Sequence, residues 1–352
     1  SHTFPPRDPW LSGYAISYYH FGYVIVAMLT RLSGLASDVT FNLTVAMLFA
    51  LAANGAFSLT YGMVEAYRAR RGAADEALIG APSEGAARSG ILAALLLVAM
   101  GNLEGLFELI RARGWGSEAL WRWLDVRNLG ASAPSRAWYP DDGWWWWRAS
   151  RVIHDRLPGG GYDEVISEFP FFSFLLGDVH PHVLALPFVL LALALALNVL
   201  LSIERLPAHG ALTTRDAGPV AWLRRHARSL WPGDAADLAL WSLLIGALGF
   251  LNTWDMPIYL GLLLVAYAVR RQIDQPSTSA WLSDAVTLGA VLSILCIALY
   301  APFYLGFRSQ AAGIGWVGAI KTRPHQYLLM FGALLVPVVG WLALTAGRHL
   351  RL

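Results

Sequence analysis

Acidic and imidazole side chains directly precede a long apolar run in the middle of the chain. Asp178, His180 and His182 alternate along the backbone, with Gly177 before them and Pro181 between the histidines. Glycine and proline favour an extended or turned backbone, which would point the three polar side chains to the same side. Such a set could bind a divalent cation such as Mg²⁺ or Mn²⁺, hold a phosphate, or pass protons. The structural alternative is that these residues cap the following helix and lie in the lipid headgroup layer.

Further residues that could do chemistry lie before and after this triad. Asp8 is flanked by prolines in the first loop, and a rigid loop can hold a carboxylate in place. We take Asp8, Glu168 and Asp178 as the catalytic candidates. The candidates for binding a substrate are Tyr18, Tyr19, His20, Glu104, Trp147, Arg151, Asn252, Trp254 and Asp255.

The composition excludes a soluble domain and predicts a polytopic membrane protein. Hydrophobic residues make up 56% of the chain and charged residues 14%, with a mean hydropathy of +0.48. Cys296 is the single cysteine, so the sequence offers neither a disulfide framework nor a thiolate metal site. A net charge of +2 gives no reason to expect nucleic acid as a partner.

The apolar segments predict an all-α transmembrane bundle of about seven spans and one juxtamembrane helix. The juxtamembrane helix is expected at 18–35. The spans are expected at 39–67, 87–106, 183–203, 238–251, 256–269, 282–305 and 327–346. The fourth and fifth spans are short for a full crossing and would draw Asn252 and Asp255 below the membrane surface, where ionisable groups are costly and often functional.

The pattern favours a single membrane domain over residues 1–352, with two large loops. Residues 107–170 form a tryptophan-rich outer loop, because indole rings at this density suit the headgroup region. Residues 204–235 form a basic cytoplasmic loop. The chain opens on a polar, proline-rich segment, so we expect that a preceding span is missing from this sequence.

The basic clusters predict the orientation independently of the motifs. If the spans alternate, the clusters at 68–71, 204–228, 270–271 and 348–351 all fall on one side, which the positive-inside rule makes cytoplasmic. The candidate residues then fall on the opposite side. The sequence therefore predicts one site at the non-cytoplasmic surface of the cell's plasma membrane.

Five ordered motifs carry a resemblance to a known family. They are residues 8–10, 18–23, 145–153, 168–174 and 177–182, and the segment at 252–257 extends the likeness. In this order they resemble the YYY membrane protein family. One departure is visible, because the third tyrosine of the name-giving triplet is His20 in this chain.

The resemblance implies a function, because that family is similar to the GT-C class of integral-membrane glycosyltransferases. Members of this class use sugars linked to polyprenyl phosphate, and a carboxylate in the first outer loop is their usual catalytic candidate. Asp8 occupies the matching place. Arg151, together with His180 or His182, would hold the phosphate, while tryptophan and tyrosine rings would contact sugar and isoprenoid. The expected partners are thus a lipid-linked sugar and the bilayer.

Two other classes of function fit the same residues. Intramembrane acids and histidines could form the ion or proton path of a transporter, although the sequence shows no inverted repeat. A non-catalytic scaffold in a larger membrane complex could use the tryptophan-rich loop as a docking surface. No particular protein partner is indicated.

Overall fold

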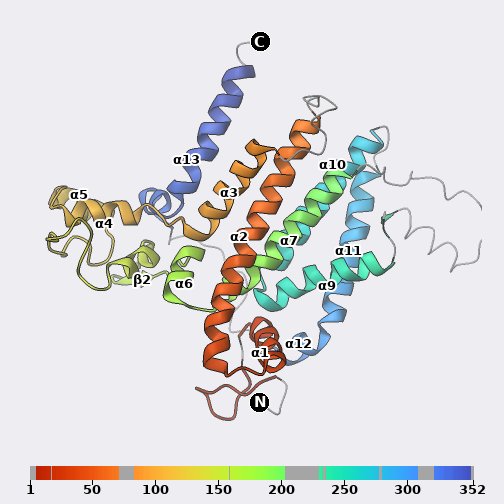
Figure 1. Cartoon of the computed structure of the whole chain (residues 1–352), viewed down its shortest axis with the longest axis horizontal. Coiled ribbons are helices and arrows are strands. Elements are labelled where there is room, and N and C mark those ends of the chain that lie inside the picture. Colours follow the sequence, from red (N-terminus) through yellow and green to blue (C-terminus); the bar gives the residue numbers. More distant parts are fainter. Residues whose placement is uncertain are drawn as a thin grey trace, which may run out of the picture. The chain divides into compact units, whose positions relative to one another are not determined.

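The computed structural model of the chain is almost entirely helical, with one short two-stranded sheet (Figure 1). It describes residues 5–16, 18–70, 83–157, 159–202, 230–231, 233, 235–276, 280–307 and 321–349. The predicted all-α class is confirmed. The chain forms two compact units, the first made of Ser1–Leu95 and Val179–Ala312, the second of Leu96–Asp178 and Gly313–Leu352.

The first unit is a bundle of helices centred on α7. Its elements are α1 (Phe21–Ser33), α2 (Ser37–Arg70), most of α3 (Glu84–Ala99), α7 (Pro181–Leu201), α9 (Ala235–Leu251), α10 (Asp255–Asp274), α11 (Trp281–Leu299) and α12 (Ala301–Gly306). Helix α7 packs against α2, α9 and α10, and α11 packs against α9 and α10. Apolar residues that repeat along each helix bury its inner faces, which holds the bundle together.

The second unit joins the tryptophan-rich segment to the last helix. Its elements are α4 (Glu104–Ala112), α5 (Glu118–Leu124), the 3₁₀ helix η2 (Trp145–Arg151), β1 (His154–Arg156), β2 (Tyr162–Glu164), α6 (Pro170–Leu176) and α13 (Pro324–His349). The two strands are antiparallel, with Asp155 opposite Asp163. A small core of Trp121, Leu124, Leu129 and Leu329 connects these elements.

The helices agree with a multi-pass membrane protein. Among the described residues, α2, α7, α11 and residues Pro324–Gly347 of α13 are long and apolar enough to cross a membrane. A fifth span results if α3 and α4, bent by 69°, count as one. Helices α1 and α9 are apolar but shorter. A helix lies at each of the seven positions where the sequence predicts a span, and α1 lies at the predicted juxtamembrane position.

The predicted spans at 87–106 and 282–305 each contain a break. Helix α3 ends at Ala99. Beyond this end, the Asn102 side chain forms two hydrogen bonds: its NH₂ group donates to the Ala149 carbonyl (2.6 Å), and its oxygen accepts from the Glu104 N–H (3.2 Å). Helix α11 ends at Leu299, before Pro302, because proline has no N–H with which to continue the ladder. Hydropathy alone does not reveal either break.

The arginines at the end of α10 form ion pairs inside the first unit. The Arg271 guanidinium is almost fully buried and donates to the Asp284 carboxylate of α11 at 2.8 Å. Arg270 pairs with Asp274 one turn further along α10 at 3.0 Å. Arg271 thus ties α10 to α11. Of the predicted basic loop at 204–235, residues 204–229, 232 and 234 lie outside the described part of the chain.

Candidate functional site

Asp8 lies in a tight turn before α1. Its Oδ1 accepts hydrogen bonds from the main-chain N–H groups of Trp10 (2.8 Å) and Leu11 (3.1 Å). Its own N–H donates to the Tyr14 carbonyl at 2.9 Å, which closes the loop. The carboxylate is therefore held in place, as the flanking prolines predict, and these bonds do not use Oδ2.

The Tyr18, Tyr19 and His20 segment leads into α1 through stacked rings. Tyr18 is 45% exposed, and its ring centroid lies 5.1 Å from that of Tyr19. His20 is buried edge-on against Phe250 and Phe303, and its Nδ1 bonds to the Tyr18 carbonyl at 3.0 Å. The third position of the triplet is therefore part of the packing of the first unit, whereas Tyr18 keeps an accessible face.

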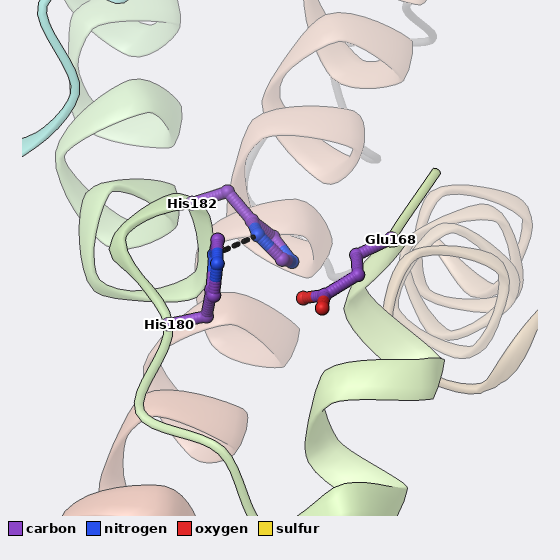
Figure 2. A group of neighbouring side chains, drawn as sticks. All are labelled: Glu168, His180 and His182. Carbon is purple, nitrogen blue, oxygen red and sulfur yellow. Dashed lines mark hydrogen bonds between the residues drawn. The ribbon is translucent and has the colours of Figure 1, made fainter. Parts of the chain in front are cut away.

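His180 and His182 contact each other at the start of α7 (Figure 2). Their Nδ1 atoms are 2.8 Å apart, so one ring donates a hydrogen bond and the other accepts it. His180 is the N-cap residue, and its carbonyl accepts from the N–H groups of Val183 and Leu184. His180 thus lies at the N-cap position, but its imidazole makes no capping hydrogen bond to the helix and instead contacts His182. Figure 2 also labels Glu168, which belongs to the second unit.

Glu168 and Asp178 lie at the two ends of α6 in the second unit. The Glu168 Oε2 accepts a hydrogen bond from the hydroxyl of Ser173 at 3.2 Å. The Asp178 N–H donates to the carbonyl of the same serine at 2.9 Å. Ser173 is fully buried, so it fixes the carboxylate of Glu168 and the backbone at Asp178.

Asn252, Trp254 and Asp255 share the turn between α9 and α10. The Asp255 N–H donates to the Asn252 carbonyl at 2.9 Å. Trp254 is 57% exposed and Asp255 is half-buried. The predicted hairpin therefore places these three residues in one turn.

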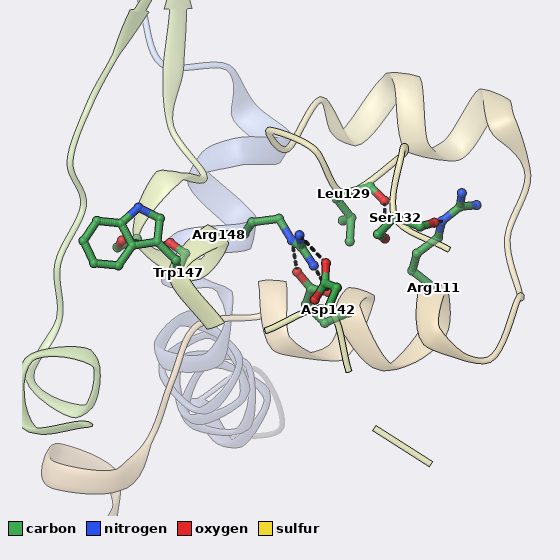
Figure 3. A network of polar contacts seen from close by, with 8 residues as sticks. Arg111, Leu129, Ser132, Asp142, Trp147 and Arg148 are labelled. Atoms are coloured by element: carbon green, nitrogen blue, oxygen red, sulfur yellow. Dashed lines mark hydrogen bonds and ion pairs between the residues drawn. The ribbon is translucent and has the colours of Figure 1, made fainter. Parts of the chain in front are cut away.

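A buried ionic network ties α4 to η2 in the second unit (Figure 3). Arg148 donates to both carboxylate oxygens of Glu108, with 2.9 Å for the Nη2 contact, and pairs with Asp142 at 2.8 Å. Burial alone would lower the pKa of Arg148, but the bonds to these two carboxylates outweigh it and raise that pKa. Sequence reasoning selected Arg151 from this segment and missed Arg148.

Glu104 lies one turn before Glu108 on α4 and is fully buried. Neither Glu104 carboxyl oxygen has a hydrogen-bond partner among the described residues. Helix α4 is amphipathic and turns 69° away from α3, so we place it outside the spans. Burial and then the adjacent Glu108 raise the pKa of Glu104 well above its ordinary value, and Arg148 opposes them only in part. The proton therefore belongs on Glu104.

A cavity of about 280 Å³ opens beside this network. Its walls are Arg127, Asn128, Trp144, Trp147, Arg148 and Arg151. The buried Arg151 guanidinium lies over the Trp147 ring, 4.6 Å from its centroid, and donates to the Ser150 carbonyl. Trp147 and Arg151 were predicted from the sequence, and the structure adds the other four residues.

The walls of this cavity suit an anion that carries an apolar or ring-shaped group. Guanidinium groups bind phosphate or carboxylate oxygens, and indole faces stack on rings. The volume of about 280 Å³ lies just below the usual range of small-molecule pockets, which begins at about 300 Å³, so the cavity has room for no more than a headgroup. Arg148 and Arg151 are held by their own partners, so the cavity is preorganised.

The comparisons with known proteins identify a family and no activity. No curated protein and no solved structure matches the sequence. The family described as "Uncharacterized membrane protein (DUF2298)" matches residues 1–351. This agrees with the many apolar helices and with the likeness seen in the ordered motifs. The chain therefore belongs to this family of uncharacterized membrane proteins.

Proposed function

We propose that the protein is a GT-C-like glycosyltransferase that moves a sugar from a polyprenyl-phosphate donor to an acceptor on the non-cytoplasmic side of the plasma membrane. The observation that supports this proposal is the cavity lined by three arginines and two tryptophans. An anionic donor headgroup with an attached sugar ring has the chemistry that such walls recognise.

In the proposed reaction, the bond between the sugar's anomeric carbon and the phosphate oxygen breaks as the acceptor oxygen bonds to the same carbon. The phosphate leaves with the electron pair of the broken bond. Arg151 stabilises the negative charge that develops on the phosphate, and Trp147 stacks against the sugar. Asp8 accepts the proton of the acceptor hydroxyl, with its carboxylate oriented by the turn.

A divalent cation, Mg²⁺ or Mn²⁺, held by Asp178, His180 and His182 remains part of the proposal. The hydrogen bond between the two imidazoles occupies their Nδ1 atoms, so each histidine would use Nε2 as its ligand. A cation bound there would neutralise charge on the phosphate. Tyr18, Trp254 and the carboxylates Glu168 and Asp255 are the remaining proposed substrate contacts.

The cavity's role is tested by measuring how a polyprenyl-phosphate analogue binds to the purified protein, with tryptophan fluorescence as the readout. Arg151→Gln should weaken binding about tenfold to a hundredfold, because a charged hydrogen bond is lost. The control is Arg136→Gln, an exposed arginine outside the cavity. Equal affinity of both variants would remove the cavity from the proposal.

The base is tested by turnover of a polyprenyl-phosphate sugar. Asp8→Asn keeps an oxygen for the N–H groups of Trp10 and Leu11 but cannot accept a proton. Transfer should fall by about 10² or more while binding of the donor persists. Normal turnover would exclude Asp8 and make Glu168, Asp178 or Asp255 the next candidate. Ion flux into liposomes without any sugar transfer would instead favour a transporter.

A further inference from the structure

A groove of about 810 Å³ runs between α2 and α7. Both helices are long and apolar enough to span a membrane, and they pack side by side in the first unit (Figure 1). Leucine is the commonest residue in its wall, and only 22% of the most apolar window of α2 is buried within the structure. The groove lies wholly in the first unit. It shares no residue with the cavity lined by Arg127, Arg148 and Arg151, and it plays no part in the proposed transfer reaction.

The groove forms because α2 and α7 are in contact near Gly55 and diverge further along α2, near Gly62. At Gly55 they are so close that an added Cβ would lie 2.8 Å from Leu190 Cδ1. Two turns further along α2, a Cβ added at Gly62 would meet no described atom within 4 Å. Leu190 lies near the middle of α7 (Pro181–Leu201), so the groove opens from mid-span toward the C-terminal ends of both helices.

Polar side chains line this groove and decide what can fill it. Asn54 and Ser58 of α2 and Asn198 of α7 are exposed in the groove. None of the three makes a side-chain hydrogen bond to a residue that the structure describes. Within a bilayer, water is absent and hydrocarbon cannot bond to an amide, so uncovered amides are costly. A lipid chain would leave this cost in place, whereas a helix with its own polar side chain would remove it.

We propose that the groove binds α2 of a second copy of this chain, which makes the protein a parallel dimer. A two-fold axis along the membrane normal places the same residue of both copies at the same depth. Asn54 then faces Asn54 of the second copy, and each amide can donate to the other's carbonyl, because the amide group carries both a donor and an acceptor.

The size of the groove agrees with a helix as its occupant. A helix about 10 Å in diameter with a pitch of 5.4 Å fills roughly 400 Å³ per turn. A volume of about 810 Å³ therefore takes about two turns. The α2 residues that line the groove run from Leu51 to Gly62, about three turns, so two turns of a second helix fit within this length.

The first experiment fills the groove and counts copies. Fluorescently labelled protein is diluted into vesicles, and photobleaching steps give the dimer fraction. The unsubstituted protein should bleach mostly in two steps. Gly62→Trp should abolish the dimer, since the new ring occupies the groove, and Asn54→Leu should weaken association about threefold to tenfold. The control is Gly261→Trp on α10, where a Cβ also meets no described atom within 4 Å.

The second experiment identifies the occupant. Oxidation of Ser58→Cys in native membranes should give a disulfide-linked dimer of this chain, because the single natural cysteine, Cys296, is buried. Ile294→Cys, 67% exposed on α11, should not cross-link. Single-step bleaching of the unsubstituted protein, a cross-link to a different polypeptide, or reaction of Ser58→Cys with a hydrophilic thiol reagent would each overturn the proposal. The last result would mean that water, not a helix, fills the groove.

Discussion

Glu104 and Glu108 lie one turn apart on α4 and are both buried, yet they differ in their surroundings. Arg148 binds both oxygens of Glu108, while the oxygens of Glu104 find no partner in the described part of the chain. One guanidinium cannot neutralise two adjacent carboxylates and Asp142 as well. The least costly arrangement keeps the proton on Glu104, because burial disfavours its charged form.

The raised pKa of Glu104 predicts the sign of a pH effect on stability. Folding raises the pKa of Glu104, so the contribution of this group to folding stability is fully present below the ordinary carboxyl pKa. That contribution is lost as the pH rises toward the pKa of Glu104 in the folded state. Glu104→Gln mimics the protonated acid. It should raise the melting temperature at pH 8 but change it little at pH 4, measured on purified protein in detergent.

The control for this measurement is Glu118→Gln, because Glu118 has a side chain that is 76% exposed. Its replacement should leave the pH dependence as it is in the unsubstituted protein. If Glu104→Gln also kept the original pH dependence, Glu104 would be ionised in the folded protein. The inference that folding raises its pKa would then be wrong.

At the scale of elements, the ion pair between Arg271 and Asp284 is a buried polar connection between α10 and α11. The two side chains are 1% and 4% exposed. Asp284→Asn leaves a buried guanidinium without its counter-charge, so we expect a loss of about 3–5 kcal/mol in stability, seen as a lower melting temperature. Glu84→Gln removes an exposed pair with Arg88 on α3, where the two side chains are 84% and 80% exposed, and should cost clearly less.

A double variant separates the unpaired charge from the packing of the two helices. Arg271→Met with Asp284→Leu removes both charges at once and should recover most of the stability lost in Asp284→Asn. Equal melting temperatures of Asp284→Asn and Glu84→Gln would show that the connection between the helices does not depend on this pair.

At the scale of the whole molecule, the orientation in the membrane follows from the arginine clusters. A cysteine at Ala133, which is exposed in the tryptophan-rich region, should react with an impermeant thiol reagent in intact cells. Cysteines at Gly72 and Gly210 lie outside the described residues, in or beside the basic segments, and should be protected. The reverse labelling pattern would place the candidate residues on the cytoplasmic side.

The sequence by itself determined the membrane class and the positions of the helices. The predicted spans at 39–67 and 183–203 correspond to α2 (Ser37–Arg70) and α7 (Pro181–Leu201). This works because hydropathy is a local property, and apolar stretches of this length are stable as helices in lipid without any particular neighbour. The ordered motifs also gave the family, and the prolines beside Asp8 indicated a fixed turn.

The surroundings of the individual side chains were decided only by the tertiary structure. Nothing in the local sequence shows that Arg148 binds Glu108, forty residues earlier in the chain, or that Arg127 shares a cavity with Trp144. The burial of His20 depends in the same way on rings contributed by distant helices. A carboxylate, a guanidinium or an imidazole has the same intrinsic chemistry everywhere. Its charge and its access to a ligand depend on burial and on partners, and both arise when distant segments pack together.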